Sequence, residues 1–582
     1  MNKNLVFDVE TDGLKPKEIF CIVTHDVDTQ VTSAFGPDEL DKAYEVLLNA
    51  DKLIGHNIAN YDIPVIKNLA GIDLTKKRII DTLVLSRLFN PTRAENHSLK
   101  SWGYRLNFPK TEFDEFDSYT PEMLQYCKND VLLNYKVYEA LRKEAKGFSI
   151  ESINLEHQVT VLLKQQEDYG FLFDQRHASI LLAELTEKVD DIVEKVHKVF
   201  KPKRIETKLY PKRLKDGRMS KMAETIEGKK VRLSTEEHKE MMEKGSITLV
   251  KLIPFNLGSR KQIGEYLKEF GWKPKTFTPT GQPIIDEGTL NKIKNIPEAL
   301  LIAEYLMLQK RVSQINSWFK ELDEEDGRVH GYVNHNGTIT GRMTHRNPNM
   351  AQVPSSNAPY GEACRACWVV PPKHKLVGID ASGLELRMLA HYLEDEDFTN
   401  EILHGDIHTA NQNAAGLQSR NQAKTFIYAL IYGAGDGKLG SVVGGNKAEG
   451  KRLRESFLDN IPAFRSLVRR VERASAKGYL KGLDGRKIII RSQHSALNAL
   501  LQGAGAIVMK QALVFFSEEI QKFNAKIVGN IHDEWQVEVP EVHAEEVGRL
   551  GVEAIKKAGD VLNLKCPLDG EYQIGDNWSE TH

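Results

Sequence analysis

Up to about residue 145, short apolar runs alternate with longer segments whose apolar residues recur every three or four positions. A short continuous apolar run fits a buried strand, and the longer spacing fits one face of a helix. The pattern predicts strands over residues 5–9, 19–23 and 52–55 and helices over residues 39–49 and 121–143. This alternation is typical of an α/β domain.

The middle of the chain has a mainly helical pattern. Residues 153–199 carry leucines and valines at helical spacing, and Gly170 marks a break within them. Residues 201–252 are polar and poor in clear periodicity. Helices are predicted again over residues 259–269 and 298–321.

Two acids in the C-terminal half are predicted to lie close together. Asp380 ends an apolar run over residues 375–379 that predicts a strand. Asp533 lies between two further runs, residues 526–531 and 535–539, where a hairpin would turn. The two carboxylates would therefore meet at the edge of one sheet.

A helix is predicted between these acids, with a cationic and aromatic face. Arg420, Lys424, Tyr428 and Tyr432 recur every four residues, a spacing that keeps successive side chains on one face. This face suits a triphosphate and a base. For Tyr432 alone, packing in the core is the alternative.

A second group of acids lies near the N-terminus. Asp8 and Glu10 are two residues apart on a predicted strand and project from the same face. Asp62 and Asp130 are candidates to join them, and Tyr126 lies one helical turn before Asp130. Four carboxylates and a tyrosine match two hard divalent cations and an oriented water. For any single acid, a solvated surface charge is the alternative.

Length and composition indicate a soluble protein of several domains. The 582 residues exceed a single core and predict three or four domains. The 41% hydrophobic and 27% charged content is ordinary for a soluble protein. We expect a cytosolic protein without a membrane partner, because no apolar run approaches the roughly 18 residues of a membrane span and no signal sequence is recognisable.

Charge and cysteine content exclude some classes of protein. A net charge of −2 argues against a uniformly basic surface, although a nucleic-acid enzyme can hold positive charge locally. Five cysteines do not make a disulfide framework. Cys364 and Cys367 form an isolated pair, which coincidence explains better than zinc or redox chemistry.

Both groups of acids match known motifs. The N-terminal set resembles the DEDD-type proofreading exonucleases that carry tyrosine in the third motif. The C-terminal set resembles motifs A, B and C of family A (Pol I-like) DNA polymerases. The segments that begin at Asp380, Gly405, Lys424 and Gly482 are most similar to the replicative polymerases of short-tailed, T-seven-type bacteriophages.

The resemblance implies a multidomain α/β and α+β fold, with a ribonuclease H-like exonuclease followed by a right-hand polymerase of palm, fingers and thumb. The implied boundaries are the exonuclease at 1–148, the thumb at 149–328 with a polar and basic insertion at about 201–252, the palm at 329–402 with motif A, the fingers at 403–478 with the motif B helix at 418–433, and the palm at 479–582 with motif C.

The implied activity is template-directed transfer of nucleotides from a dNTP to a primer 3'-hydroxyl, with 3'-5' proofreading, for phage genome replication. Two alternatives are a single-subunit RNA polymerase and a nonenzymatic DNA-binding protein with a polymerase-like fold. Glu385 and the exonuclease acids argue against the first. The intact acids of both sites argue against the second.

The resemblance also implies two Mg²⁺ ions at each active site, for which Mn²⁺ can substitute. The polymerase ligands would be Asp380, Asp533 and the backbone of Ala381, with Glu534 beside them. The exonuclease ligands would be Asp8, Glu10, Asp62 and Asp130, with Tyr126 as a further catalytic residue.

The same resemblance assigns substrate contacts. His408, Arg420 and Lys424 would bind the triphosphate, with Lys424 also catalytic. Tyr428 would lie near the sugar, Tyr432 near the templating base and Glu385 at the ribose 2'-position. The implied DNA contacts are Arg342, Gln502 and His532. A phosphate contact is the alternative for Arg342, and a helix contact for Gln502.

The implied partners are primer-template DNA, dNTPs and a phage helicase-primase, in the cytoplasm of the infected bacterial host. Residues 201–218 hold eight Lys or Arg against two acids, a net charge of +6. This favours an insertion that binds DNA or docks a processivity factor, with a solvated charge run as the alternative. The terminal His582 would either lie near the palm or be frayed.

Overall fold

The computed structural model describes residues 3–214 and 217–582. The chain divides into two compact units, one made of residues 1–175 with 320–582 and the other of residues 176–319. This division is coarser than the five parts implied by the resemblance, whose boundaries stay a prediction. Each unit is described by itself below.

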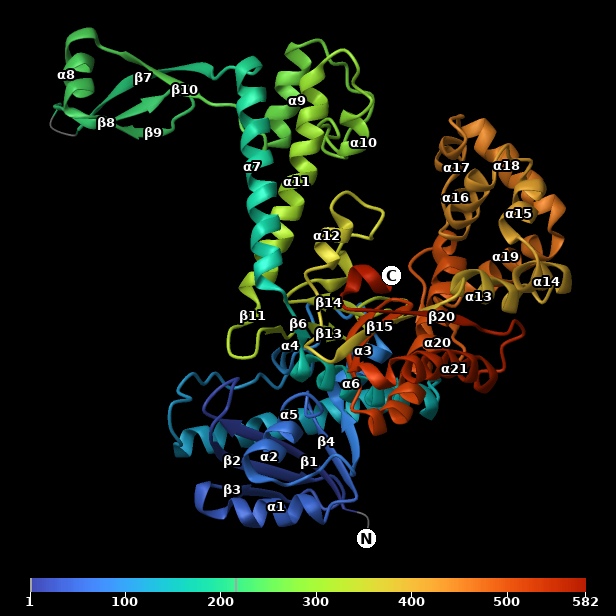
Figure 1. Ribbon diagram of the computed structural model, residues 1–582. Coiled ribbons are helices and arrows are strands. Elements are labelled where there is room, and N and C mark those ends of the chain that lie inside the picture. The colour runs from blue at the N-terminus through green and yellow to red at the C-terminus, as the bar shows by residue number, and fades with distance from the viewer. Residues whose placement is uncertain (1–2, 215–216) are drawn as a thin grey trace. The chain divides into compact units, whose positions relative to one another are not determined.

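A five-stranded sheet with the order β3-β2-β1-β4-β5 forms the centre of the N-terminal region (Figure 1). The predicted strands and helices are present, which confirms the α/β expectation, whereas β3 and β5 were not predicted. The strands are β1 (Asn4–Thr11), β2 (Ile19–Asp26), β3 (Thr32–Phe35), β4 (Lys52–Gly55) and β5 (Arg78–Asp81). The helices are α1 (Leu40–Leu48), α2 (Asp62–Ala70), α3 (Thr82–Phe89), α4 (Leu99–Arg105) and α5 (Pro121–Glu144).

The alternation of side chains along β1 sorts its residues between two layers. Leu5 and Phe7 pack into a core with residues of α1 and α2. Val6 packs with residues of α5 on the opposite face. Asp8 and Glu10 share the parity of Val6, so they project toward α5.

The C-terminal sheet has the order β18-β19-β15-β20. Asp380 lies opposite Glu534 where β15 pairs antiparallel with β19. The hairpin between β18 and β19 turns at His532 and Asp533, as predicted. The strands are β15 (His374–Ala381), β18 (Lys526–Ile531), β19 (Glu534–Pro540) and β20 (Gly570–Gly575).

Two helices, α20 (Ala496–Ile520) and α21 (Ala544–Val561), pack against each other beside this sheet. By length and composition, one segment of the described chain, Gln493–Phe523, could cross a membrane. The expectation that no apolar run approaches that length was therefore wrong. However, 78% of its apolar window is buried inside the structure, and core helices of soluble proteins pass the same test.

The predicted fingers region is helical throughout. Its motif B helix, α16, is two residues shorter at each end than predicted, so Tyr432 follows its last residue. Phe426, Ile427 and Ile431 pack into the core and leave the opposite side of α16 to polar residues. The helices of this region are α15 (Ile407–Ala415), α16 (Arg420–Ile431), α17 (Asp436–Val442), α18 (Lys447–Asn460) and α19 (Pro462–Ser475). Before them, α13 (Leu384–Leu393) lies in the predicted palm, and α14 (Glu396–His404) spans the predicted boundary between palm and fingers.

Helix α6 (Ile150–Tyr169) ends at Gly170, whose φ of 71° is a conformation that favours glycine. The predicted break is thus confirmed. Short elements complete this unit: β6 (Phe171–Leu172), β11 (Leu322–Asp323), β12 (Arg328–Val329), β13 (Tyr332–Asn334), β14 (Thr344–Arg346), α12 (Gly361–Arg365), β16 (Tyr479–Lys481) and β17 (Lys487–Ile489).

Glu156 on α6 is fully buried among charged partners. Its Oε1 accepts hydrogen bonds from Lys510 Nζ at 2.6 Å and from Arg486, and its Oε2 contacts His335 Nδ1. Arg486 also donates to Asp484. Burial alone would raise the pKa of Glu156, but the two cations hold it well below its ordinary value. This charge cluster fixes α6 to the C-terminal half of the chain.

The second unit contains the helices predicted after the break at Gly170. Helix α9 starts one residue later than expected, and α11 spans nearly the expected residues. The helices are α7 (Gln175–Val199), α9 (Arg260–Glu269), α10 (Glu287–Leu290) and α11 (Pro297–Lys320).

The polar stretch at 201–252 folds into a sheet with the order β10-β7-β8-β9 and one helix, α8. This sheet was not predicted, because the stretch is poor in clear periodicity, and in β7 six of eleven residues are charged. A small core forms nonetheless from Leu209, Ala223, Leu233, Met241 and Ile247. The elements are β7 (Lys203–Arg213), β8 (Met219–Thr225), β9 (Lys230–Arg232), α8 (Thr235–Lys244) and β10 (Ile247–Ile253).

The substitution Glu156→Gln should lower the thermal unfolding midpoint by several degrees. It leaves Lys510 and Arg486 buried with one acid fewer, and breaking a buried ion pair costs about 3–5 kcal/mol. Calorimetry measures the midpoint, with Glu151→Gln, an exposed residue of α6, as the control. Equal midpoints for the two variants would contradict the structural role of the cluster.

Candidate functional site

The C-terminal acids meet as predicted from the sequence. Asp380 ends β15, and the backbone N–H of Ala381 donates to the carbonyl of Asp533 at 3.1 Å, which fixes the turn beside the strand. Burial, together with repulsion from Asp533 and Glu534, raises the pKa of Asp380 to about 7. Burial also raises the pKa of Asp533. Like charges are therefore held together in a poorly solvated place.

Glu385 is held by two neighbours at the start of α13. Its Oε1 accepts hydrogen bonds from Arg342 at 2.8 Å and from the hydroxyl of Tyr432 at 2.5 Å. Tyr432 is 42% exposed, which excludes simple core packing. Arg342, Glu385, His532 and Asp533 line one pocket, so these predicted site residues come together.

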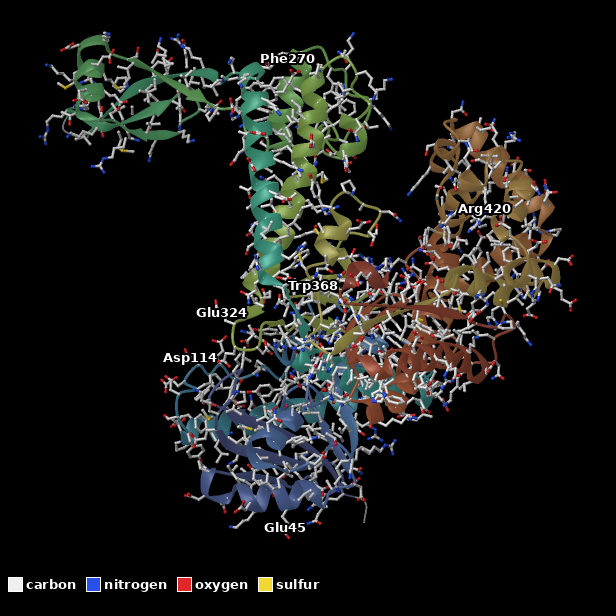
Figure 2. All side chains as sticks on the ribbon, in the orientation of Figure 1. Glu45, Asp114, Phe270, Glu324, Trp368 and Arg420 are labelled. Atoms are coloured by element: carbon white, nitrogen blue, oxygen red, sulfur yellow. The ribbon has the colours of Figure 1, made fainter. Side chains whose placement is uncertain are left out.

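The face of α16 carries the predicted cationic and aromatic groups. Arg420 begins the helix (Figure 2), and its Nε donates to Asp406 Oδ2 at 2.7 Å. Lys424 is exposed. The rings of Tyr428 and Tyr432 stack at 6.3 Å between centroids, and His408 lies 6.4 Å from Tyr428. Asp406, the partner of Arg420, was not singled out from the sequence.

Glu534 is engaged by the C-terminal residues of the chain. Its Oε1 accepts hydrogen bonds from Trp578 Nε1 and from Gln536 Nε2, both at 2.6 Å, and its Oε2 lies 2.8 Å from His582 Nδ1. Burial would raise the pKa of Glu534, but the hydrogen bond with His582 lowers it overall. The chain end is therefore bound beside Asp533. Nothing in the sequence linked Trp578 to Glu534.

The two remaining predicted DNA contacts lie on different elements. His532 is exposed in the β18–β19 turn and has a φ of 58°. Gln502 lies partly exposed on α20. In the part of the chain that the structure describes, no hydrogen bond, ion pair or ring contact joins Gln502 to the other site residues, so its role stays a prediction.

The N-terminal acids form a second buried cluster. Asp62, the first residue of α2, accepts a hydrogen bond from the backbone N–H of Val9 at 3.0 Å, which brings it to β1. Burial and repulsion from Asp130 raise the pKa of Glu10 to about 8, and burial raises that of Asp62 to about 7. Burial and the neighbouring acids raise the pKa of Asp8 well above its ordinary value. All four predicted carboxylates thus interact.

Lys110 is a further member of this cluster that sequence reasoning missed. Its Nζ lies 2.5 Å from Asp130 Oδ2 and 4.9 Å from the centre of the Tyr126 ring. Phe113 stacks on Tyr126 as well, with 5.3 Å between the ring centroids. Lys110 lies outside any predicted element, so no periodicity pointed to it. It holds both motif-three residues, Tyr126 and Asp130.

Comparison with known proteins decides the family. The model of DNA polymerase family A matches residues 224–580, more than half of the chain, and the model of the 3'-5' exonuclease matches residues 2–146. The chain belongs to DNA polymerase family A. It carries a 3'-5' exonuclease domain at its N-terminus, and both kinds of domain are metal-dependent in this family.

Phage polymerases match this family A polymerase over its whole length. The DNA-directed DNA polymerase of Escherichia phage T7 is 32% identical, over 99% of this chain and 100% of the relative. That of Enterobacteria phage T3 is 33% identical over the same shares. The polymerase domain of Pol1 from M. smegmatis, solved in complex with DNA primer-template and dNTP, has a TM-score of 0.77 at 19% identity, covering 100% of this chain and 96% of that one.

These matches support the polymerase over the two alternatives. The predicted fold class is confirmed, because the exonuclease and polymerase models lie in the expected order. A single-subunit RNA polymerase and a nonenzymatic DNA-binding protein are not supported. The N-terminal carboxylate cluster lies in the exonuclease domain, and the C-terminal cluster lies in the polymerase domain.

The substitution Lys110→Gln should slow the exonuclease by about 10–100-fold, the usual cost of removing a group that supports metal ligands. It removes the cation that offsets the charge of Asp130 and positions Tyr126. Degradation of single-stranded DNA measures the effect, with the exposed Lys100→Gln as the control and primer extension unchanged in both. An exonuclease as fast as that of the control would contradict this role.

Proposed function

We propose that this polymerase replicates a phage genome in the cytoplasm of the infected bacterial host, by extending a DNA primer with dNTPs and removing misincorporated ends. The main support is the full-length similarity to the polymerases of phages T7 and T3. The two separate carboxylate clusters support the two activities. A helicase-primase of the same phage is the expected partner at the replication fork.

The metal at both sites is proposed to be Mg²⁺, with two ions at each site and Mn²⁺ as a substitute. The residues fit such ions, since carboxylate oxygens are the ligands that hard divalent cations prefer. The Oδ1 atom of Asp130 is buried without a hydrogen-bond partner among the described residues, which leaves a lone pair available. When bound, these ions supply positive charge to the reacting phosphate and activate the attacking oxygen.

In the polymerase domain, Asp380, Asp533 and the Ala381 carbonyl are proposed to hold the ions. Their clustering of negative charge, expressed in the raised pKa of Asp380, supports this. Glu534 would position neighbouring groups rather than bind an ion, because its two carboxylate oxygens already contact Trp578 and His582. In the exonuclease domain the proposed ligands are Asp8, Glu10, Asp62 and Asp130, with Tyr126 orienting the water.

The fingers residues are proposed to bind the incoming dNTP. Arg420, Lys424 and His408 would contact the triphosphate, where fixed donors stabilise charge that develops on the leaving group. Arg420 must first leave Asp406, with which it forms an ion pair. Tyr428 would pack against the sugar.

Sugar and base-pair selection are proposed to depend on the Glu385 group. The hydrogen bonds from Arg342 and Tyr432 restrict the rotamers of Glu385, so its side chain can exclude a ribose 2'-hydroxyl. Tyr432 would occupy the templating position until a template base arrives. Arg342, Gln502 and His532 would contact the primer-template, where minor-groove acceptors are similar for every correct pair.

The module of residues 203–253 is proposed to dock a processivity factor. Its β7–β10 pair leaves Tyr210, Val250 and Leu252 exposed by 39%, 49% and 64%. Exposed apolar residues on a sheet suit a protein partner better than solvent. Arg204 and Lys208 are also part of this pair and add positive charge. Lys215 and Asp216, which belong to the basic stretch, lie outside the described residues.

The two activities should separate by mutation. Asp8→Ala combined with Glu10→Ala should abolish degradation while extension continues, because these acids belong only to the exonuclease cluster. Asp533→Ala should reduce extension by several orders of magnitude and spare degradation. Parallel extension and degradation assays measure both. If either variant lost both activities equally, the assignment of two independent sites would be wrong.

Replacing residues 203–253 by a short linker should shorten the product made per binding event only when host extract supplies the factor. Single-turnover extension with excess trap DNA, with and without extract, measures this length. Direct DNA binding predicts instead that the purified variant alone makes shorter products, and that its log-log salt slope is flatter by about 0.9 for each phosphate it no longer binds. Unchanged products in both conditions would indicate a module that is merely solvated.

A further inference from the structure

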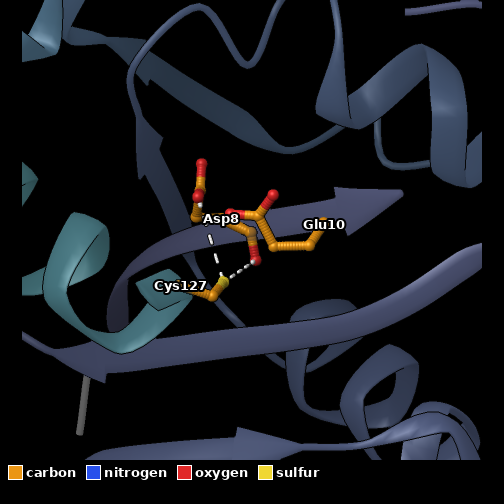
Figure 3. Close-up of side chains that lie close together, drawn as sticks. All are labelled: Asp8, Glu10 and Cys127. Atoms are coloured by element: carbon orange, nitrogen blue, oxygen red, sulfur yellow. Dashed lines mark hydrogen bonds between the residues drawn. The ribbon is translucent and has the colours of Figure 1, made fainter. Parts of the chain in front are cut away.

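The exonuclease cluster contains a thiol that neither activity uses. Cys127 Sγ and one carboxylate oxygen each of Asp8 and Glu10 lie within 4.8 Å of one another (Figure 3). Sγ approaches the carbonyl oxygen of Asp8 at 3.6 Å and its Oδ2 at 3.9 Å. Among the described residues, this is the one group of three metal-ligating side chains with ligand atoms this close.

The fold places this thiol there through the packing of α5 on β1. Cys127 is fully buried in the core that Val6 and α5 form, on the same face from which Asp8 and Glu10 project. Cys21 pairs with Glu10 across β1 and β2, and its thiol contacts that of Cys127. Two thiols therefore form the floor beneath the carboxylates.

A buried carboxylate oxygen in this cluster is a second observation that points to a cation ligand. Asp130 is only 2% exposed, and its Oδ1 has no hydrogen-bond partner among the described residues. Its charge acts on both Asp8 and Glu10. A buried acceptor without a partner is costly, so an ion at this place would satisfy it.

We propose that the exonuclease site also binds a thiophilic divalent cation, Zn²⁺ or Cd²⁺, through Cys127 Sγ together with Asp8 and Glu10. This rests on the proposed metal role of the two acids. Typical zinc–sulfur and zinc–oxygen bonds of about 2.3 and 2.0–2.2 Å allow a bridged S···O separation of up to about 4.5 Å. The observed 3.9 Å between Sγ and Asp8 Oδ2 meets this limit.

The choice between ions follows from thiol chemistry. Binding forms a metal–sulfur bond, breaks the S–H bond and releases one proton to solvent, with no change of oxidation state. The Cys127 thiol lies against the carbonyl oxygen and Oδ2 of Asp8, and Mg²⁺ prefers these oxygens to sulfur. Soft ligands select Zn²⁺ and Cd²⁺ instead. These ions would compete for the acids and inhibit proofreading.

Cadmium absorbance tests the sulfur bond directly. The full-length protein, freed of divalent ions, should gain a thiolate-to-cadmium charge-transfer band in the ultraviolet when Cd²⁺ is added. Cys127→Ser should lose this band, while Cys566→Ser, which removes a buried cysteine elsewhere, should keep it. An equal band in wild type and Cys127→Ser, or no band in wild type, overturns the proposal.

A second experiment measures whether Cd²⁺ inhibits the exonuclease through Cys127. Cd²⁺ is added to single-strand degradation in excess Mg²⁺, and each protein is compared with its own rate in Mg²⁺ alone. Half-inhibition of Cys127→Ser should require at least about tenfold more Cd²⁺ than half-inhibition of wild type or Cys566→Ser, and equal requirements would refute the inference. A different result would show that Asp8 and Glu10 do not bind Mg²⁺ as proposed. In that case, Asp8→Ala would degrade DNA normally in Mg²⁺ alone.

Discussion

The structure is organised around carboxylates of like charge held together away from water. In the polymerase domain, a tight hairpin brings Asp533 to the end of the strand that carries Asp380. In the exonuclease domain, strand parity and two helices assemble four acids on one side of β1. Charges packed in this way repel one another, and burial weakens the solvation that would offset the repulsion. The folded chain therefore tolerates an unfavourable arrangement that divalent cations would relieve.

The buried cluster around Glu156 shows the opposite solution. There, Lys510 and Arg486 face Glu156 and Asp484, so the charges balance and the pKa of Glu156 is lowered. This cluster joins α6 to the C-terminal half without any ion from outside. The contrast separates the two kinds of buried charge in this protein. Balanced charge holds the scaffold, whereas unbalanced negative charge gathers at the two proposed catalytic sites.

Much of this arrangement could be predicted from the sequence, where local patterns are strong. Strands β4 and β18 lie at the predicted residues, and the hairpin at Asp533 follows from two apolar runs separated by a turn. The four exonuclease acids and the face of α16 follow from periodicity and motif resemblance. These features depend on residues that are close in sequence or on spacings that a strand or helix fixes.

The rest depends on contacts between distant residues or on weak patterns. Glu534 is adjacent to a metal-ligand candidate, yet its carboxylate is engaged by Trp578 and His582 through tertiary packing. Lys110 reaches Asp130 from a loop without periodicity. The module at 203–253 was missed because its sequence lacks clear periodicity and its core is small. Cys127 is part of a recognised motif segment, but only the structure reveals its distance from Asp8.

The central claim is that unbalanced carboxylates make the polymerase site dependent on a divalent cation. Thermal unfolding of wild type and Asp380→Asn at pH 8, with chelator and then with Mg²⁺, tests it most directly, because Asp380 is ionised above its raised pKa of about 7. With chelator, Asp380→Asn should be more stable than wild type, because the variant has lost one of the negative charges that repel each other. Mg²⁺ should then raise the midpoint of wild type more than that of the variant, as ligand binding to the folded state requires. A variant that is less stable with chelator, or that gains as much from Mg²⁺ as wild type, would contradict the account.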